Sequence, residues 1–138
     1  MHENFARNPL TDYIDENKHW ERELSDPLGE FAFTVKNSKR PGEERLWIFS
    51  YNQINSNFRK PECRIARGII LEITDGKVTR IVRRAFDKFF NAREGLADKI
   101  DWASDDVYLS EKRDGSIMEL YSYNGQWYWS TSGMFHAD

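Results

Sequence analysis

An Asp-Gly dipeptide at residues 75–76 stands between two strand-like segments and constrains the fold of this chain more than any other feature. Residues 63–74 before it are rich in branched apolar side chains, and residues 77–83 after it alternate polar and apolar ones. Side chains of a strand point alternately to opposite faces, so this alternation is typical of a strand with one buried face. Asp-Gly suits the two-residue turn that joins antiparallel strands. The sequence therefore predicts a β-hairpin here.

A second hairpin is predicted around Asn124 and Gly125, the best short-range turn signal in the chain. Its strands cover residues 116–123 and 126–132. The second of them carries Trp127 and Trp129, and packing in a sheet core is the more common use of such residues, although one aromatic face could also stack bases.

The other expected elements are short. Strands are expected at residues 31–36, 46–51 and 107–111, and helices at residues 11–24 and 91–100. Residues 37–44 and 52–61 are expected to be loops. Because strands dominate and helices are few, the fold class is α+β with a mainly antiparallel β-sheet and a few short helices.

Composition limits the classes of protein to which the chain can belong. With 138 residues, 39% of them hydrophobic and 31% charged, residues 1–138 are long enough for a single domain with its own core. The longest apolar run is only a few residues, so neither a membrane span nor a signal peptide is expected, and we expect a cytoplasmic protein. Cys63 is the one cysteine, which excludes an internal disulfide and a thiolate-rich zinc site.

Charge is distributed unevenly, although the net charge is only −3. Residues 77–93 contain one acid, Asp87, and six cations: Lys77, Arg80, Arg83, Arg84, Lys88 and Arg93. Such a basic stretch around an aromatic pair can receive phosphates from ATP or RNA. For any one of these cations, a solvated strand face is the commoner explanation.

The strongest functional signal is residues 111–117, Glu-Lys-Arg-Asp-Gly-Ser-Ile. They place Lys112 between an expected strand end and a glycine turn, where an amine can be presented to a phosphate. Lysine, any residue, then Asp-Gly resembles the nucleophile motif of the covalent nucleotidyltransferases, the ATP-dependent ligases and capping enzymes. The alternative is a solvated hairpin corner, because Asp-Gly is also an ordinary turn dipeptide.

Two upstream segments narrow the resemblance. Residues 63–73, Cys-Arg-Ile-Ala-Arg-Gly-Ile-Ile-Leu-Glu-Ile, contain an Ala-Arg-Gly strand, and residues 84–91, Arg-Ala-Phe-Asp-Lys-Phe-Phe-Asn, contain a Lys-Phe-Phe-Asn segment. Both are similar to signatures of the bacteriophage-type ATP-dependent RNA ligases of the tRNA-repair class, and they precede Lys112 in that family's order. The resemblance spans about residues 46–135 and implies the N-terminal part of a ligase adenylyltransferase domain.

The resemblance implies a reaction in which Lys112 attacks the α-phosphorus of ATP and carries AMP, with Mg²⁺ or Mn²⁺ as the metal and tRNA-like RNA ends as partners. A lysine amine in water is protonated at neutral pH, so a nucleophilic lysine must be desolvated or lie near other cations. Arg113, Arg67 and Lys88 are the candidate cations. The sequence does not identify the metal ligands.

The same resemblance assigns nucleotide contacts upstream of the lysine. Arg67 would bind the β- or γ-phosphate, since a guanidinium can bind two oxygens at once. Lys88 would be a second phosphate contact, and Phe90 would lie near the nucleotide or support Lys88, while Phe89 is expected in the core. A surface ion pair is the alternative role of Arg67.

Three further roles lie beside the lysine. Glu111 would lie beside adenine, although an exposed strand glutamate is more common. Asp114 would orient Lys112 or hold a water on the metal. Gly115 would let the backbone approach the nucleotide closely. For Asp114 and Gly115 an ordinary turn is the alternative.

Later motifs of similar ligases, including a Glu-Gly strand and a Lys-x-Lys strand, do not follow Lys112 within these residues. Ser132 also stands where family members commonly have a basic residue. We therefore expect a truncated ligase or one half of a split enzyme, with very poor adenylylation alone and no sealing. Two other hypotheses are a non-catalytic RNA- or nucleotide-binding module, and an interaction protein whose acidic N-terminal helix docks a partner.

Overall fold

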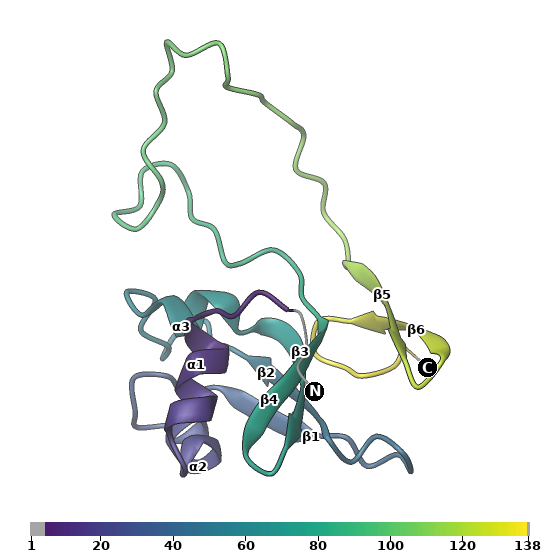
Figure 1. Cartoon of the computed structure of the whole chain (residues 1–138). Helices are drawn as coiled ribbons and strands as arrows, with labels where there is room; N and C mark the ends of the chain where they lie inside the picture. Colours follow the sequence, from purple (N-terminus) through teal and green to yellow (C-terminus); the bar gives the residue numbers. More distant parts are fainter. Residues whose placement is uncertain (1–4, 138) are drawn as a thin grey trace.

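Four antiparallel strands form the central sheet of the chain, in the order β1-β2-β3-β4 (Figure 1). The structure is a computed structural model that describes residues 5–137. The strands of this sheet are β1 (Thr34–Asn37), β2 (Leu46–Ser50), β3 (Arg67–Thr74) and β4 (Lys77–Arg83). The expected hairpin is confirmed, because β3 pairs with β4 and Thr74 faces Lys77 across the turn. Asp75 and Gly76 have φ of 52° and 79°, as this turn requires.

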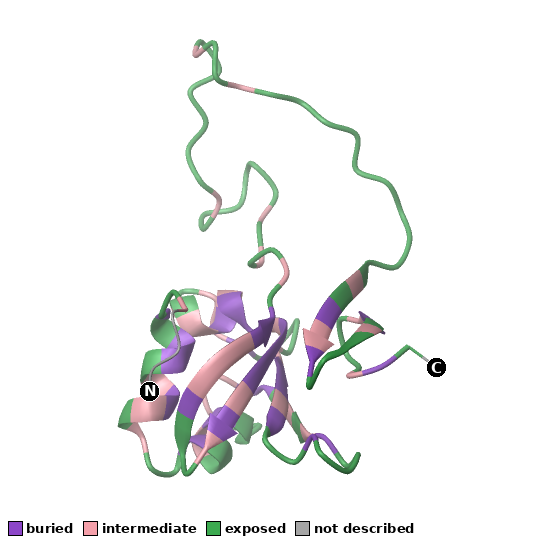
Figure 2. Ribbon diagram, turned by 45° about the vertical axis from the view of Figure 1, so that its right-hand side comes forward, coloured by how far each residue is buried: buried purple, intermediate pink, exposed green. Residues whose placement is uncertain are grey.

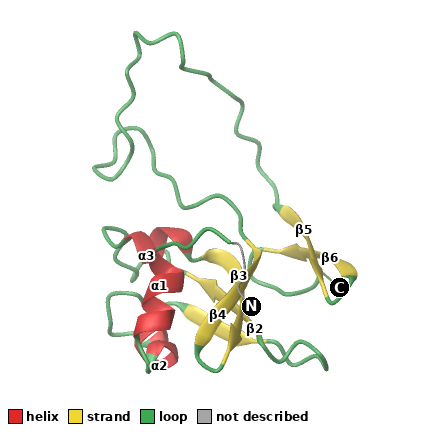
Figure 3. Cartoon of the chain, in the orientation of Figure 1, coloured by secondary structure: helices red, strands yellow, loops and turns green. Residues whose placement is uncertain are grey.

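Three short helices cover one face of the sheet, as Figure 3 shows. They are α1 (Pro9–Glu16), α2 (Trp20–Ser25) and α3 (Pro61–Ile65). The prediction of one helix over residues 11–24 was wrong, because Asn17 leaves the helical conformation and its side-chain amide donates to the carbonyl of Tyr13. In the described part of the chain, no helix is long and apolar enough to cross a membrane.

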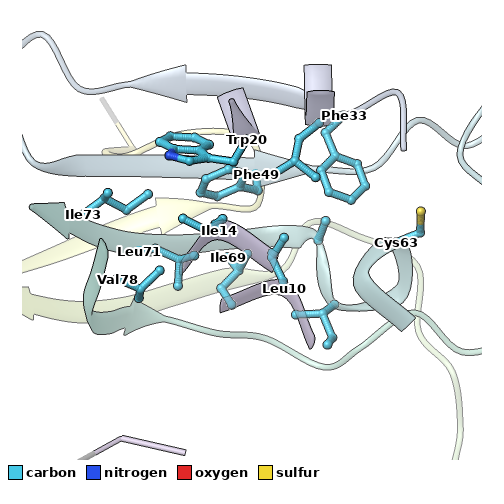
Figure 4. Packing of buried hydrophobic residues seen from close by; sticks show 13 residues of the cluster. Leu10, Ile14, Trp20, Phe33, Phe49, Cys63, Ile69, Leu71, Ile73 and Val78 are labelled. Atoms are coloured by element: carbon cyan, nitrogen blue, oxygen red, sulfur yellow. The ribbon is translucent and has the colours of Figure 1, made fainter. Parts of the chain in front are cut away.

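The core between helices and sheet is built from apolar side chains of both layers (Figure 4). Trp20 of α2 contacts Trp47 and Phe49 of β2, with ring centroids 5.0 and 5.8 Å apart. Leu10 and Ile14 of α1 lie on the same side, four residues apart on one helix face. This packing fixes the helical layer against β2 and β3.

The opposite face of the sheet is covered by a separate hairpin of β5 (Met118–Tyr123) and β6 (Gln126–Thr131), which confirms the second predicted hairpin. Tyr121 and Tyr123 point inward and pack with Leu46, Ile48, Ile70 and Val82 of the central sheet. The expectation that the tryptophans pack in a core was wrong, since Trp127 and Trp129 are 69% and 57% exposed. They lie on the other face of the hairpin, where Trp129 faces Leu120.

The start of β3 also differs from the expectation. Residues 61–65 form α3, and the strand begins at Arg67 instead of Cys63. Pro61 explains the change, since proline is favoured in the first turn of a helix. Cys63 is fully buried in this helix.

Residues 84–117 form a long excursion without helix or strand between β4 and β5. Figure 2 shows it as a mostly exposed strip that projects from the body. The expected helix at residues 91–100 and strand at residues 107–111 are absent, because this segment packs against too little of the protein to stabilise them. With this exception the α+β architecture is confirmed.

Candidate functional site

Arg67 lies at the start of β3, where the strand meets the beginning of the excursion. Its guanidinium Nη1 donates to the carbonyl of Phe86 at 3.4 Å, and its Cζ lies 5.6 Å from the ring centroid of Phe89. The side chain is half-buried, and within residues 5–137 it has no carboxylate partner. Most of its hydrogen-bonding capacity is therefore free to bind an anion.

Lys88 is enclosed by three aromatic rings. Its Nζ lies 5.4, 5.0 and 5.2 Å from the ring centroids of Tyr51, Phe58 and Phe90. Its backbone N–H donates to the carbonyl of Arg64 at 2.8 Å, which ties this part of the excursion to the end of α3. A cation attracted by ring faces is held in one place while its charge stays unpaired.

Residues 86–90 therefore contact or contain all three predicted residues. Arg67, at the end of β3 that follows α3, contacts Phe86 and Phe89, and Lys88 lies against the ring of Phe90. Two cations that lack carboxylate partners and lie against aromatic rings can form charge-assisted hydrogen bonds to a phosphate. The expectation that Phe89 lies in the core was wrong, since it is 60% exposed and stacks against Arg67.

Lys112 lies far along the excursion and is exposed, as are Glu111, Asp114 and Gly115. Among the described residues, its side chain makes no ion pair, and two of the three cations expected around it, Arg67 and Lys88, make their contacts elsewhere. Its neighbours Glu111 and Arg113 pair with each other at 3.6 Å. The structure therefore does not bring Lys112 next to Arg67 or Lys88, because the strand expected to carry it is not formed. Gly115 has φ of 143°, a conformation that favours glycine.

Arg83 is the structural residue that sequence reasoning missed. It was grouped with exposed cations, but it is only 4% exposed at the end of β4. Its guanidinium donates to the carbonyls of Gly68, Thr131, Ser132 and Met134 and to the hydroxyl of Ser130. Its Nε lies 3.2 Å from Oε2 of Glu119. Burial lowers the pKa of Arg83, and Glu119 opposes this shift.

Gly68 explains how closely the two sheets approach each other. It has φ of 74°, and a Cβ added there would lie 2.1 Å from the carbonyl oxygen of Ser132. The glycine next to Arg67 therefore lies directly against the chain that follows β6. In the sequence, the Arg-Gly pair predicted a strand, and nothing in it indicated that Gly68 makes a contact between the two sheets.

Metal ligands are not evident in the described residues. Within residues 5–137 there is no group of three or more His, Cys, Asp or Glu side chains able to hold a metal ion. Asp114, which was expected near a metal-bound water, is exposed on the excursion. The described side chains do not fit a metal site of their own.

Known proteins match this chain over most of its length. A family model described as RNA ligase matches residues 65–138, which include β3 to β6 and the excursion. A protein of Autographa californica nuclear polyhedrosis virus, which carries the provisional name bifunctional polynucleotide kinase/RNA ligase, is 30% identical over 116 residues. The match covers 78% of this chain and 16% of the viral protein, so the chain spans about one sixth of its relative.

Proposed function

Because this chain belongs to the RNA ligase family, we propose that it is the N-terminal part of an ATP-dependent RNA ligase and that Lys112 is its AMP-accepting nucleophile. The observation that supports this proposal most is the match over residues 65–138, which contains Arg67, Lys88 and Lys112 in one segment. Arg67 and Lys88 each lie beside an aromatic ring of residues 86–90 and have no carboxylate partner among the described residues, which supports a phosphate site at the start of this segment.

The proposed chemistry has three steps. The neutral Nζ of Lys112 attacks the α-phosphorus of ATP, the bond to the β-phosphate oxygen breaks, pyrophosphate leaves, and the amine loses a proton to solvent. An oxygen of an RNA 5′-phosphate then attacks the same phosphorus and breaks its bond to nitrogen. Finally a 3′-hydroxyl attacks the 5′-phosphorus, its proton passes to solvent, the bond to the AMP oxygen breaks, AMP leaves, and the strands are joined. Alignment and charge neutralisation are what the protein contributes.

Residue roles follow from this chemistry. Arg67 and Lys88 neutralise the β- and γ-phosphates, and Phe90 holds Lys88. Glu111, Asp114 and Gly115 flank the nucleophile, Glu111 toward the base and Asp114 toward the amine. The phosphates of ATP would hold Mg²⁺ or Mn²⁺, which would neutralise part of their charge, and no step depends on a metal site made of protein side chains alone.

We propose that a further polypeptide portion completes the enzyme, either as an extension of the chain or as a separate half. The outward face of the β5-β6 hairpin supports this, since Met118, Leu120, Trp127 and Trp129 are all about half-exposed or more. A two-stranded sheet with an apolar outer face is rarely stable unless another layer covers it. Ordering of the excursion around Lys112 is expected to need the same partner.

The test is transfer of label from α-³²P-ATP with magnesium to the protein, followed by mapping of the labelled peptide. The chain is tested alone and mixed with the C-terminal ligase portion of the viral relative. Lys112→Arg is compared with Lys99→Arg, which changes an exposed lysine of the same excursion.

We expect weak labelling of the isolated chain and stronger labelling in the mixture. Lys112→Arg should lose the label completely, and Lys99→Arg should be labelled as strongly as the unmodified protein. Labelling that survives Lys112→Arg would overturn the nucleophile assignment. RNA binding without any label in either preparation would favour the non-catalytic module.

A further inference from the structure

A pocket of about 480 Å³ lies between the start of α1, α3 and residues 84–98. Its lining includes Arg64, Lys88, Asn8 and Phe89. None of the ligase motifs contains Asn8, and Arg64 had no expected role. We propose that this pocket binds a phosphate group of a nucleotide or RNA strand and that Arg64 is its principal contact.

The charge of the lining favours an anion. Four cations, Arg7, Arg64, Arg84 and Lys88, face two carboxylates, Asp87 and Asp98. Arg7 and Arg84 are already paired, with Asp12 and Asp15 and with Asp87 respectively. Among residues 5–137, Arg64 and Lys88 have no carboxylate partner. The positive charge available to a ligand therefore comes from these two side chains.

Two hydrogen-bond donors on lining residues lack an acceptor in the described part of the chain. They are Nε of Arg64 and Nδ2 of Asn8, and both are buried. The Asn8 amide is held in this orientation, because its Oδ1 accepts from the backbone N–H groups of Leu10 and Thr11 at 2.9 and 3.0 Å. Both atoms have almost no accessible surface, so an anion in the pocket reaches them only after a small shift of the lining, and an acceptor there removes the cost of leaving buried donors unpaired.

Aromatic side chains complete the pocket. Phe89 and Phe90 contribute rings to its wall beside the cations. Rings accept bases of any sequence by stacking, while the cations neutralise the backbone. A nucleotide unit, with its phosphate toward Arg64 and its base toward the rings, matches this division of the pocket.

The proposal extends the proposed function to a second phosphate contact, but it does not depend on Lys112. Lys112 lies on the exposed part of the excursion and does not line this pocket. Binding through Arg64 can therefore be measured without any covalent step.

The experiment measures binding of a short fluorescent RNA by anisotropy, with a 5′-phosphate or a 5′-hydroxyl, and competition by ATP. Arg64→Gln is compared with Arg22→Gln, which removes an exposed arginine of α2 outside the pocket. Charged hydrogen bonds are worth about 1.5–3 kcal/mol, which corresponds to a loss of about tenfold or more in Arg64→Gln.

We expect Arg22→Gln to bind like the unmodified protein. Preference for the 5′-phosphate assigns the pocket to the RNA end, equal binding of both RNAs assigns it to a backbone phosphate, and competition by ATP assigns it to the nucleotide. Unchanged affinity in Arg64→Gln would overturn the proposal.

A second measurement avoids the risk that Arg64→Gln does not fold. In the unmodified protein, the NMR signals of Arg64 Nε–H and of the Asn8 side-chain amide are followed during titration with inorganic phosphate and with the 5′-phosphorylated RNA. We expect both signals to move with either ligand. Signals that stay in place while the RNA binds would place the phosphate elsewhere and refute the pocket.

Discussion

The guanidinium of Arg83 and the carboxylate of Glu119 form an ion pair between the two sheets, with side chains only 2% and 12% exposed. Arg83 ends β4 and Glu119 lies in β5, so the pair joins the points where the excursion leaves and re-enters the body. Carbonyls from both sides complete the arrangement. A planar guanidinium with five donors suits this set of acceptors better than an ammonium.

Removing one member of this pair should be costly. In Arg83→Met, Glu119 keeps a nearly buried charge without a partner, and we expect a loss of about 3–5 kcal/mol in the free energy of unfolding. Urea denaturation measures this. Arg22→Met on the surface of α2 serves as the control and should change stability by less than about 0.5 kcal/mol. An equally small effect at both positions would show that the buried pair contributes nothing.

Gly68→Ala tests the close contact between the sheets. Both Gly68 and Gly76 have positive φ, but a Cβ meets Ser132 at Gly68 and nothing within 4 Å at Gly76. Gly76→Ala should therefore lower the free energy of unfolding by only about 1–2 kcal/mol, because alanine must adopt a left-handed backbone conformation there. Gly68→Ala should cost about 1–3 kcal/mol more, from overpacking. Equal losses in thermal denaturation would contradict the contact.

Alkaline pH should destabilise the fold through buried tyrosines. Burial, assisted by Glu43, raises the pKa of Tyr121 from 10.0 to about 12. The folded state therefore keeps a proton that the unfolded state releases, so this stabilisation is complete below pH 10 and is lost as the pH rises toward 12. Urea midpoints from pH 8 to 12 measure the effect.

Tyr121→Phe provides the matched test of that pH dependence. The variant loses the hydroxyl that donates to the carbonyl of Phe135, so it should be less stable overall. Its urea midpoint should fall less steeply between pH 10 and 12. Tyr108→Phe, at an 89% exposed ring, should keep the original slope. Identical slopes in all three proteins would rule out Tyr121 as the source.

Brief trypsin treatment should cut the excursion before the body. Arg93, Lys99, Lys112 and Arg113 are exposed there and lie in no helix or strand. Cleavage follows local opening, which is easiest where backbone hydrogen bonds are few. Mass spectrometry should find early cuts at these four positions and an intact β1-β4 core. Early cuts at Lys77 or Arg80 would show instead that the sheet opens as readily as the excursion.

Local signals in the sequence were sufficient where the chain makes its own turns. Asp75-Gly76 and Asn124-Gly125 fixed both hairpins, because their φ angles depend on two adjacent residues. Helix ends were harder to place. Asn17 ends α1 in an extended conformation, and a pattern of apolar residues does not report such a break.

Contacts between sheets could not be read from the sequence. Val82 and Arg83 are adjacent in β4 and both buried, so the simple alternation of a strand fails there. The reason is that the C-terminal part of the chain covers both: Val82 packs with Tyr121 and Tyr123 of the hairpin, and Arg83 is enclosed by Glu119 and the carbonyls that follow β6. At the candidate site, the motif order identified Arg67 and Lys88, whereas Arg64 had no role assigned and Asn8 lies outside the motif segments, and the two come together only in the folded chain.

The closed excursion has a consequence for the amine that it carries. Glu119 lies seven positions after Lys112, so the lysine can move at most about 25 Å from the anchored strand, at roughly 3.3–3.6 Å per residue. A short tether of this kind keeps a group at an effective concentration in about the millimolar range near its anchor. Because both ends of the excursion are anchored in the sheets, the amine stays within this distance of the body while it meets its reaction partner.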